Sequence, residues 1–185
     1  MSSTEQATQK LNQVDWSKLP LDKALKIVKG DGSRSIAVFS DPQCPYCIKF
    51  EQEVINHIDN VTVYLFLFPL PFHDKALPYS EEILCSSNPS QAWGNWMTTQ
   101  KGLVGTEAAV KKACTPAALA AAQAKLAEMK QVGQYVHVTG TPTIVFPNGQ
   151  VIPGALPLEQ FNQALDAATG TSPEASAPVS ASAAK

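Results

Sequence analysis

The chain has 185 residues, of which 44% are hydrophobic and 16% charged, and its formal net charge is −2 at pH 7. This length and apolar content suit a single domain with a packed core. The small negative charge offers no attraction to nucleic acid or to an anionic membrane surface, so we expect neither as a partner. The longest apolar run, residues 61–68, is interrupted by Thr62 and is too short to span a membrane, so we expect no membrane insertion.

The first 20 residues are expected to form an N-terminal extension. They begin with the polar stretch MSSTEQ, which has no apolar region of the kind that a signal peptide needs. We favour a mature chain with an added initiator methionine over a natural cytoplasmic protein.

The first regular elements form a strand–helix–strand pattern. Residues 21–29 place leucine, alanine and isoleucine at helical spacing and end before Gly30, which predicts a helix with a glycine C-cap. The apolar runs 36–39 and 61–68 predict strands, and residues 48–58 between them predict a helix. Two strands joined through a helix form a βαβ unit with a parallel pair.

The motif Cys44-Pro45-Tyr46-Cys47 falls at the junction between the first strand and its helix. A thiol at a helix N-terminus lies beside unpaired backbone N–H groups and the positive end of the helix dipole, and both favour the thiolate. We therefore predict that Cys44 is a nucleophile with a lowered pKa. Cys47, one turn further on, is placed to close a disulfide with Cys44 and to release a captured substrate.

A zinc site is the alternative for a C-x-x-C motif. Zinc needs about four ligands, usually from a second such motif or a histidine pair. The other cysteines, Cys85 and Cys114, lie far apart, and His57, His73 and His137 show no ligand spacing. We therefore expect redox chemistry and no metal. The tetrapeptide by itself does not identify the redox family, because small glutaredoxins also use it.

A helical insertion is expected over residues 78–136. Three prolines after residue 68 interrupt the strand pattern, and the following segment is rich in alanine, glutamine and lysine. Thr115-Pro116 is a typical N-cap followed by proline at the first helical position. An insertion of this size would not fit a minimal glutaredoxin. Trp93 and Trp96 are expected to pack between its helices.

Thr141-Pro142 precedes the next apolar strand, residues 143–146. Proline lacks an N–H, so Pro142 must lie at a strand start or edge. An ordinary trans proline is the simpler interpretation, but with a C-x-x-C upstream and Asn148-Gly149 turn chemistry downstream we favour a cis bond. Such a turn opposite the cysteines would leave the backbone of Thr141 free to pair with a peptide substrate.

The chain is expected to close with a second strand over residues 151–152 and a helix over residues 158–167. Residues 169–185 are dominated by alanine, serine, proline and threonine, which predicts a disordered tail.

Three segments together resemble the catalytic domain of the DsbC/DsbG family of bacterial periplasmic thiol:disulfide isomerases. They are FSDPQCPYC at 39–47, TGTP at 139–142 and NGQVIPG at 148–154. The resemblance implies an α/β thioredoxin fold over residues 21–168, with the helical insertion lying between a βαβ half and a C-terminal ββα half. It also implies a periplasmic location and no cofactor.

The resemblance implies a role for each matching residue. Cys44 would attack and Cys47 would resolve, with Pro45 and Tyr46 supporting the active site, and Thr141 and Pro142 would bind substrate. Cys85 and Cys114 resemble the second, non-catalytic disulfide of the family. A second redox pair is the alternative for these two, but neither has C-x-x-C proximity or a clear helix N-terminus, so we favour a structural disulfide.

Two departures from the family pattern affect the expected activity. Family members carry an N-terminal dimerisation domain, for which the 20 residues before Leu21 are too few, so we expect a monomer. Val38 occupies the position where thioredoxin has a buried aspartate that assists proton transfer. Either another group or water takes the proton from Cys47, or Cys47 resolves slowly, and slow resolution would suit reshuffling of a substrate better than simple reduction.

We therefore expect a thiol:disulfide oxidoreductase that acts as isomerase or reductase on disulfide-containing or unfolded secreted proteins, recycled by a membrane thiol reductant. A dithiol oxidase is the near alternative, decided by the reduction potential. A peptide-binding chaperone module that uses the Thr141–Pro142 edge is the alternative from another class.

Overall fold

The structure is a computed structural model that describes residues 13–169. Its centre is a five-stranded sheet in the order β1-β3-β2-β4-β5. The strands are β1 (Leu25–Lys29), β2 (Arg34–Ser40), β3 (Val61–Leu67), β4 (Thr143–Val145) and β5 (Val151–Pro153). Only β2 and β3 pair in parallel, as the strand–helix–strand pattern predicts, and the other pairings are antiparallel.

Strand β2 lies in the middle of the sheet and ends at the candidate active site. Its residues Ile36 to Phe39 are each at most 2% exposed. A strand covered on both faces is expected to be a continuous apolar run, which explains the lack of alternation here. The end of β2, at Ser40, is therefore fixed in the core, and the active-site turn begins there.

The prediction of a helix over residues 21–29 is wrong. The chain instead forms a short 3₁₀ turn, η2 (Leu21–Lys23), followed by β1, whose Leu25 and Ile27 oppose Leu65 and Val63 of β3. Gly30, with φ +59°, belongs to the turn into β2 and does not cap a helix. Nine residues are too few to separate a helical from a strand pattern, and pairing along β3 decided the outcome.

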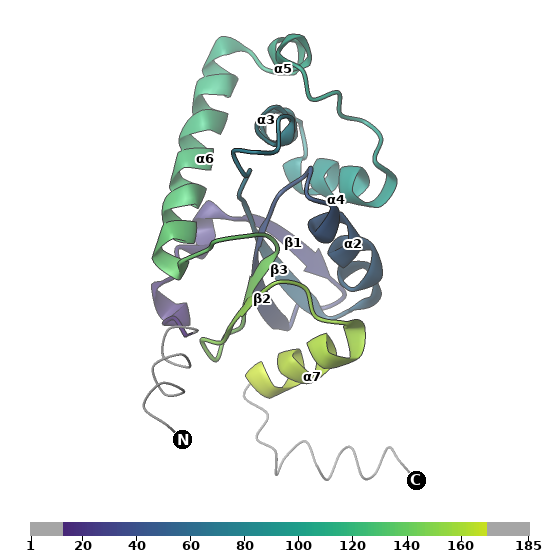
Figure 1. The fold of residues 1–185 in the computed structure, drawn as a ribbon, viewed down its shortest axis with the longest axis vertical. Helices are drawn as coiled ribbons and strands as arrows, with labels where there is room; N and C mark the ends of the chain where they lie inside the picture. The colour runs from purple at the N-terminus through teal and green to yellow at the C-terminus, as the bar shows by residue number, and fades with distance from the viewer. Residues whose placement is uncertain (1–12, 170–185) are drawn as a thin grey trace.

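Helices cover both faces of the sheet (Figure 1). On one face lie α2 (Pro45–Glu53) and α7 (Leu158–Ala168), joined by an edge contact between Phe50 and Phe161. On the other lies α6 (Pro116–Val136), whose Met129 is fully buried and accepts a hydrogen bond from the backbone of Leu67. The helix expected over residues 48–58 ends earlier, at Glu53, and a 3₁₀ turn, η3 (Ile55–His57), follows it.

The segment between β3 and β4 is helical. Before α6 it contains α3 (Ala76–Leu84), α4 (Pro89–Thr99) and α5 (Glu107–Ala113). Thr106 and Thr115 cap α5 and α6 by accepting a hydrogen bond from the backbone of Ala109 and Ala118, respectively. A disulfide joins Cys85 at the end of α3 to Cys114 at the end of α5, with Cα atoms 5.4 Å apart.

Trp93 and Trp96 both lie in the core, at 0% and 6% exposed, as the sequence predicts.

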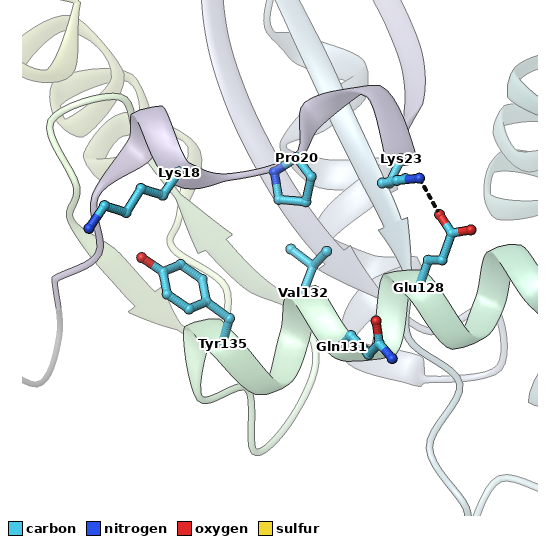
Figure 2. A pocket seen from close by; sticks show the side chains of 7 residues that line it. All are labelled: Lys18, Pro20, Lys23, Glu128, Gln131, Val132 and Tyr135. Atoms are coloured by element: carbon cyan, nitrogen blue, oxygen red, sulfur yellow. Dashed lines mark ion pairs between the residues drawn. The ribbon is translucent and has the colours of Figure 1, made fainter.

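The described part of the N-terminal extension packs on the domain. The backbone of Val14 donates to Gly149, and Leu19 is buried in the core, so residue 20 does not mark a structural break. Figure 2 shows a pocket between this segment and α6, spanned by an ion pair of 2.7 Å between Lys23 and Glu128. Both side chains are more than 40% exposed, so the pair contributes little stability. Residues 1–12, and the expected tail from residue 170 onwards, lie outside the described residues.

None of the helices within residues 13–169 is both long enough and apolar enough to cross a membrane.

Candidate active site

Both cysteines of the C-x-x-C motif lie at the start of α2, directly after the central strand. Cys44 occupies the N-cap position and is 4% exposed, while Cys47 lies within the first turn and is fully buried. Pro45 follows at the first helical position, where its missing N–H costs nothing. Tyr46 points outward and is 72% exposed. Both thiols are free in this structure.

The fold brings the Thr141–Pro142 turn against Cys44. The peptide bond between Thr141 and Pro142 is cis, the state that the sequence favours. The Sγ atom of Cys44 lies 3.6 Å from the carbonyl oxygen of Thr141, to which it donates when the thiol is protonated, although 97 positions separate the two residues in the sequence. The backbone of Gly154 donates to the Pro142 carbonyl at 2.8 Å and so ties the turn to the end of β5. The two segments singled out in the sequence therefore form one site.

The two thiols have opposite electrostatic environments. A hydrogen bond from the Cys47 thiol, with smaller contributions from Thr141 and from the backbone N–H groups of Tyr46 and Cys47, lowers the pKa of Cys44 to about 5 despite its burial. Burial raises the pKa of Cys47, and its hydrogen bond to Cys44 adds to that shift. Cys44 is thus the group that can be a thiolate at neutral pH while Cys47 keeps its proton.

The turn before Cys44 is organised by Asp41, a residue that the sequence analysis did not single out. Asp41 is fully buried, and its Oδ1 atom accepts from the backbone N–H groups of Gln43 at 2.7 Å and Cys44 at 3.1 Å. Its Oδ2 atom accepts from the backbone of Leu70 at 2.8 Å and contacts Nδ1 of His73 at 2.7 Å. The Asp41-Pro42 dipeptide after a strand is a turn signal that could have identified it.

Two further contacts hold the same turn. The Gln43 side chain donates to Asp74 and accepts from the backbone of Lys75, at 2.8 and 2.7 Å. The indole of Trp96 donates to the Pro42 carbonyl at 2.8 Å. The active-site turn is therefore supported both by the loop after β3 and by α4 of the insertion.

The remaining predicted residues lie elsewhere. Cys85 and Cys114 are bonded to each other in the insertion, and His57 and His137 are exposed on the surface. Val38 is buried in β2 and pairs with Leu65 and Ile144, so its position offers no ionisable group. Within residues 13–169 no cluster of three or more histidine, cysteine or acidic side chains could hold a metal ion.

An apolar groove of about 740 Å³ opens beside this site. It runs between the loop after β3 and helix α6 and reaches Val138 and Thr139. His73 lines it together with Phe72, which is 77% exposed. The groove thus connects the Asp41–His73 contact to the surface.

A family model for the thioredoxin-like domain matches residues 21–169. The chain belongs to the thioredoxin-like domain family. The expected thioredoxin fold with its helical insertion is therefore confirmed.

Relatives of this thioredoxin-like domain include two DsbC proteins. One, from Bordetella parapertussis and named "Probable thiol:disulfide interchange protein DsbC", is 36% identical over 88% of this chain and 52% of its own length. "Thiol:disulfide interchange protein DsbC" of Escherichia coli K12 is 26% identical over 79% of this chain and 57% of its own. The resemblance to DsbC is confirmed, and the chain spans about half the length of these relatives.

Among solved structures, a disulfide interchange protein from Neisseria gonorrhoeae superposes with a TM-score of 0.64 at 32% identity, covering 80% of this chain and 97% of that one. A periplasmic thioredoxin-like protein from Salmonella enterica serovar Typhimurium matches at 18% identity with a TM-score of 0.61, which supports the fold alone.

Proposed function

We propose that this domain catalyses thiol:disulfide interchange in secreted proteins through Cys44 and Cys47, acting as an isomerase or reductase. The observation that carries this is the pairing of a stabilised thiolate at the start of α2 with a buried, protonated thiol one turn later. The similarity to DsbC proteins supports the same reaction class.

The chemistry follows from that asymmetry. The Cys44 thiolate attacks one sulfur of a substrate disulfide, forms a mixed disulfide with it and releases the other sulfur as a thiolate, which takes up a proton. For reduction, Cys47 loses its proton and attacks Cys44, so that the domain becomes oxidised and the substrate gains two electrons. For isomerisation, a second thiol of the substrate attacks instead and Cys44 is regenerated unchanged.

Substrate binding is assigned to the Thr141–Pro142 turn, with Pro45 and Tyr46 as supporting residues. The Thr141 carbonyl already faces the Cys44 sulfur, so an extended peptide whose cysteine meets Cys44 would run along this backbone. The exposed Tyr46 ring would border that path. Cys85–Cys114 would be structural, because it joins two helices of the insertion away from the site.

A dithiol oxidase is the second candidate, and the low pKa of Cys44 favours it. Stabilising the thiolate stabilises the reduced domain, which makes the disulfide form a stronger oxidant. The reduction potential against glutathione decides between the two. A peptide-binding chaperone that uses the Thr141–Pro142 edge is the third, and its activity would survive loss of both cysteines.

We further propose that the domain works in the periplasm, that a membrane thiol reductant recycles it, and that this chain is monomeric. The names of the DsbC relatives support thiol:disulfide interchange as the reaction, and the location and the recycling partner are taken from the family that the sequence motifs resemble. The whole unit would comprise the catalytic residues 21–168 together with the N-terminal residues that pack on them.

The test compares the wild-type chain with Cys44→Ser/Cys47→Ser in insulin reduction and in refolding of scrambled ribonuclease. Loss of both activities in the variant supports the proposal, and Cys85→Ser/Cys114→Ser is the matched control that keeps the active site. Suppression of aggregation by the first variant, without any exchange activity in the wild type, would favour the chaperone instead.

A further inference from the structure

His73 contacts the one buried carboxylate that borders the active-site turn. Its Nδ1 atom lies 2.7 Å from Oδ2 of Asp41, and the His73 side chain is 18% exposed while that of Asp41 is fully buried. The other carboxylate oxygen of Asp41 accepts from the N–H of Cys44 itself. Asp41 therefore links the histidine ring directly to the residue that carries the reacting sulfur.

The contact leaves one ring nitrogen of His73 able to change its proton occupancy. Nδ1 must carry a hydrogen to bond the carboxylate, whether the ring is neutral or charged. Within residues 13–169, Nε2 has no hydrogen-bond partner, and the ring lines the open groove beside α6. A proton can therefore bind at Nε2 without breaking the bond to Asp41.

The charge on His73 bears on Cys44 because the carboxylate that it contacts also accepts from the backbone N–H of Cys44. In general, a buried carboxylate close to a thiolate disfavours the thiolate, and a positive charge beside that carboxylate offsets the effect. Asp74 and Lys75 flank His73 on its own loop, and Lys130 faces the same groove from α6. All three are at the surface, where solvent screens them, whereas Asp41 is fully enclosed.

We propose that His73 is a positioning residue that acts through Asp41, and that its protonation at Nε2 makes the Cys44 thiolate easier to form. The inference rests on the proposed role of Cys44 as the attacking thiol. The domain would thus hold its thiolate more firmly in mildly acidic surroundings than at alkaline pH.

The test is the pH dependence of Cys44 alkylation by iodoacetamide in His73→Asn. The asparagine amide keeps a donor near the Nδ1 position but cannot become charged. We expect the rate at pH 4.5 to fall about threefold to eightfold, which corresponds to half to one pKa unit for the thiol. At pH 8.5, where the thiolate is fully formed in both proteins, the rates should agree within about twofold.

Two comparisons separate this role from a structural one. His57→Asn, on the exposed η3 turn, should match the wild type at every pH. In Asp41→Asn the thiolate should form at lower pH than in the wild type, and adding His73→Asn to it should shift the profile less than His73→Asn does when Asp41 is present, because the carboxylate whose charge His73 offsets is gone.

The proposal fails if the alkylation profiles of His73→Asn and the wild type superimpose, or if the two substitutions act additively. His73→Gln decides by the same criteria if His73→Asn does not fold, as judged by circular dichroism. Alkylation needs no disulfide substrate, so this outcome is independent of the insulin and ribonuclease assays. A chain that alkylates as expected but exchanges no disulfides would overturn the proposed function and leave the role of His73 intact.

Discussion

At the scale of single residues, the chemistry depends on how differently two neighbouring thiols are surrounded. Cys44 lies at the helix N-terminus, where the Cys47 thiol, Thr141 and two backbone N–H groups stabilise its charge. Cys47, one turn further along α2, is fully buried, and the backbone N–H of Asp41 donates to its sulfur at 3.5 Å. Three residues of separation are therefore enough to lower the pKa of one thiol and to raise that of the other.

This asymmetry predicts the reactivity of each cysteine. Cys44 should alkylate near neutral pH much faster than Cys47, because only Cys44 is a thiolate there. Mass mapping after brief iodoacetamide treatment measures both rates, and equal labelling would contradict the assignment. Cys47→Ala should accumulate mixed disulfides with substrates, whereas Cys44→Ala should abolish exchange.

A second residue-scale prediction concerns Glu51, one turn after Cys47 on α2. Burial raises the pKa of Glu51 from its ordinary value of 4.5 to about 7, and the Lys29 ammonium opposes the shift only in part. Below both values the acid is protonated in the folded and unfolded states and has no effect. As pH rises from about 4.5 to 7 the unfolded state ionises first, so stability is lost over that window and stays lower above it.

Glu51→Gln should remove this loss. The free energy of unfolding of the variant minus that of the wild type should be larger at pH 8 than at pH 4, by at most about 3 kcal/mol. Urea unfolding at both pH values measures the difference, and Glu53→Gln, at an exposed position of the same helix, is the matched control. A pH-independent difference between variant and wild type would show that Glu51 ionises over the same pH range in the folded and unfolded chains.

At the scale of elements, the helical insertion packs on the sheet and contains one covalent link between two of its own helices. The Cys85–Cys114 bond joins α3 to α5 and links two residues that are 29 positions apart in the sequence. Replacing both cysteines by alanine should cost roughly 3 kcal/mol in the chain-entropy model, with less in practice if the unfolded chain is compact. Chemical unfolding of the variant under oxidising conditions measures the loss.

The same link should resist reduction. A structural disulfide has a lower reduction potential than an active-site disulfide, so graded reductant should open Cys44–Cys47 first. Mass mapping of the alkylated products decides this. Opening of both pairs together, or of Cys85–Cys114 first, would assign redox chemistry to the insertion.

Two glycines in helices should respond in opposite ways to alanine. A Cβ atom at Gly133 of α6 would collide with the ring of Phe68, whereas one at Gly94 of α4 would meet nothing within 4 Å. Gly133→Ala should therefore lower the free energy of unfolding by about 1–3 kcal/mol through overpacking. Gly94→Ala should raise it by up to about 1 kcal/mol through helix propensity alone. Thermal unfolding of the pair tests both, and a stabilised Gly133→Ala would mean that Phe68 moves aside freely.

At the scale of the whole molecule, the exposed large apolar side chains of the described residues are spread over several elements and loops: Val28, Tyr46, Phe72, Leu77, Val104 and Tyr135. Of these, Phe72 and Leu77 share the apolar groove beside the site, which is a concave surface and not a flat dimer face. We therefore expect this 185-residue chain to be a monomer in light scattering. As a monomer it should reduce accessible disulfides well and reshuffle scrambled multi-disulfide proteins poorly, and a stable dimer with strong isomerase activity would contradict both expectations.

The sequence by itself determined the redox motif, the parallel β2–β3 pair and the helical character of the insertion. These are local properties: a C-x-x-C at a strand end, two uninterrupted apolar runs, and caps such as Thr115 before Pro116. Only the tertiary structure decided that residues 25–29 form an edge strand, because backbone pairing with β3 outweighs a short ambiguous pattern. It alone also placed Asp41 between Cys44 and His73, since a buried carboxylate takes its partners from segments that the chain brings together only on folding.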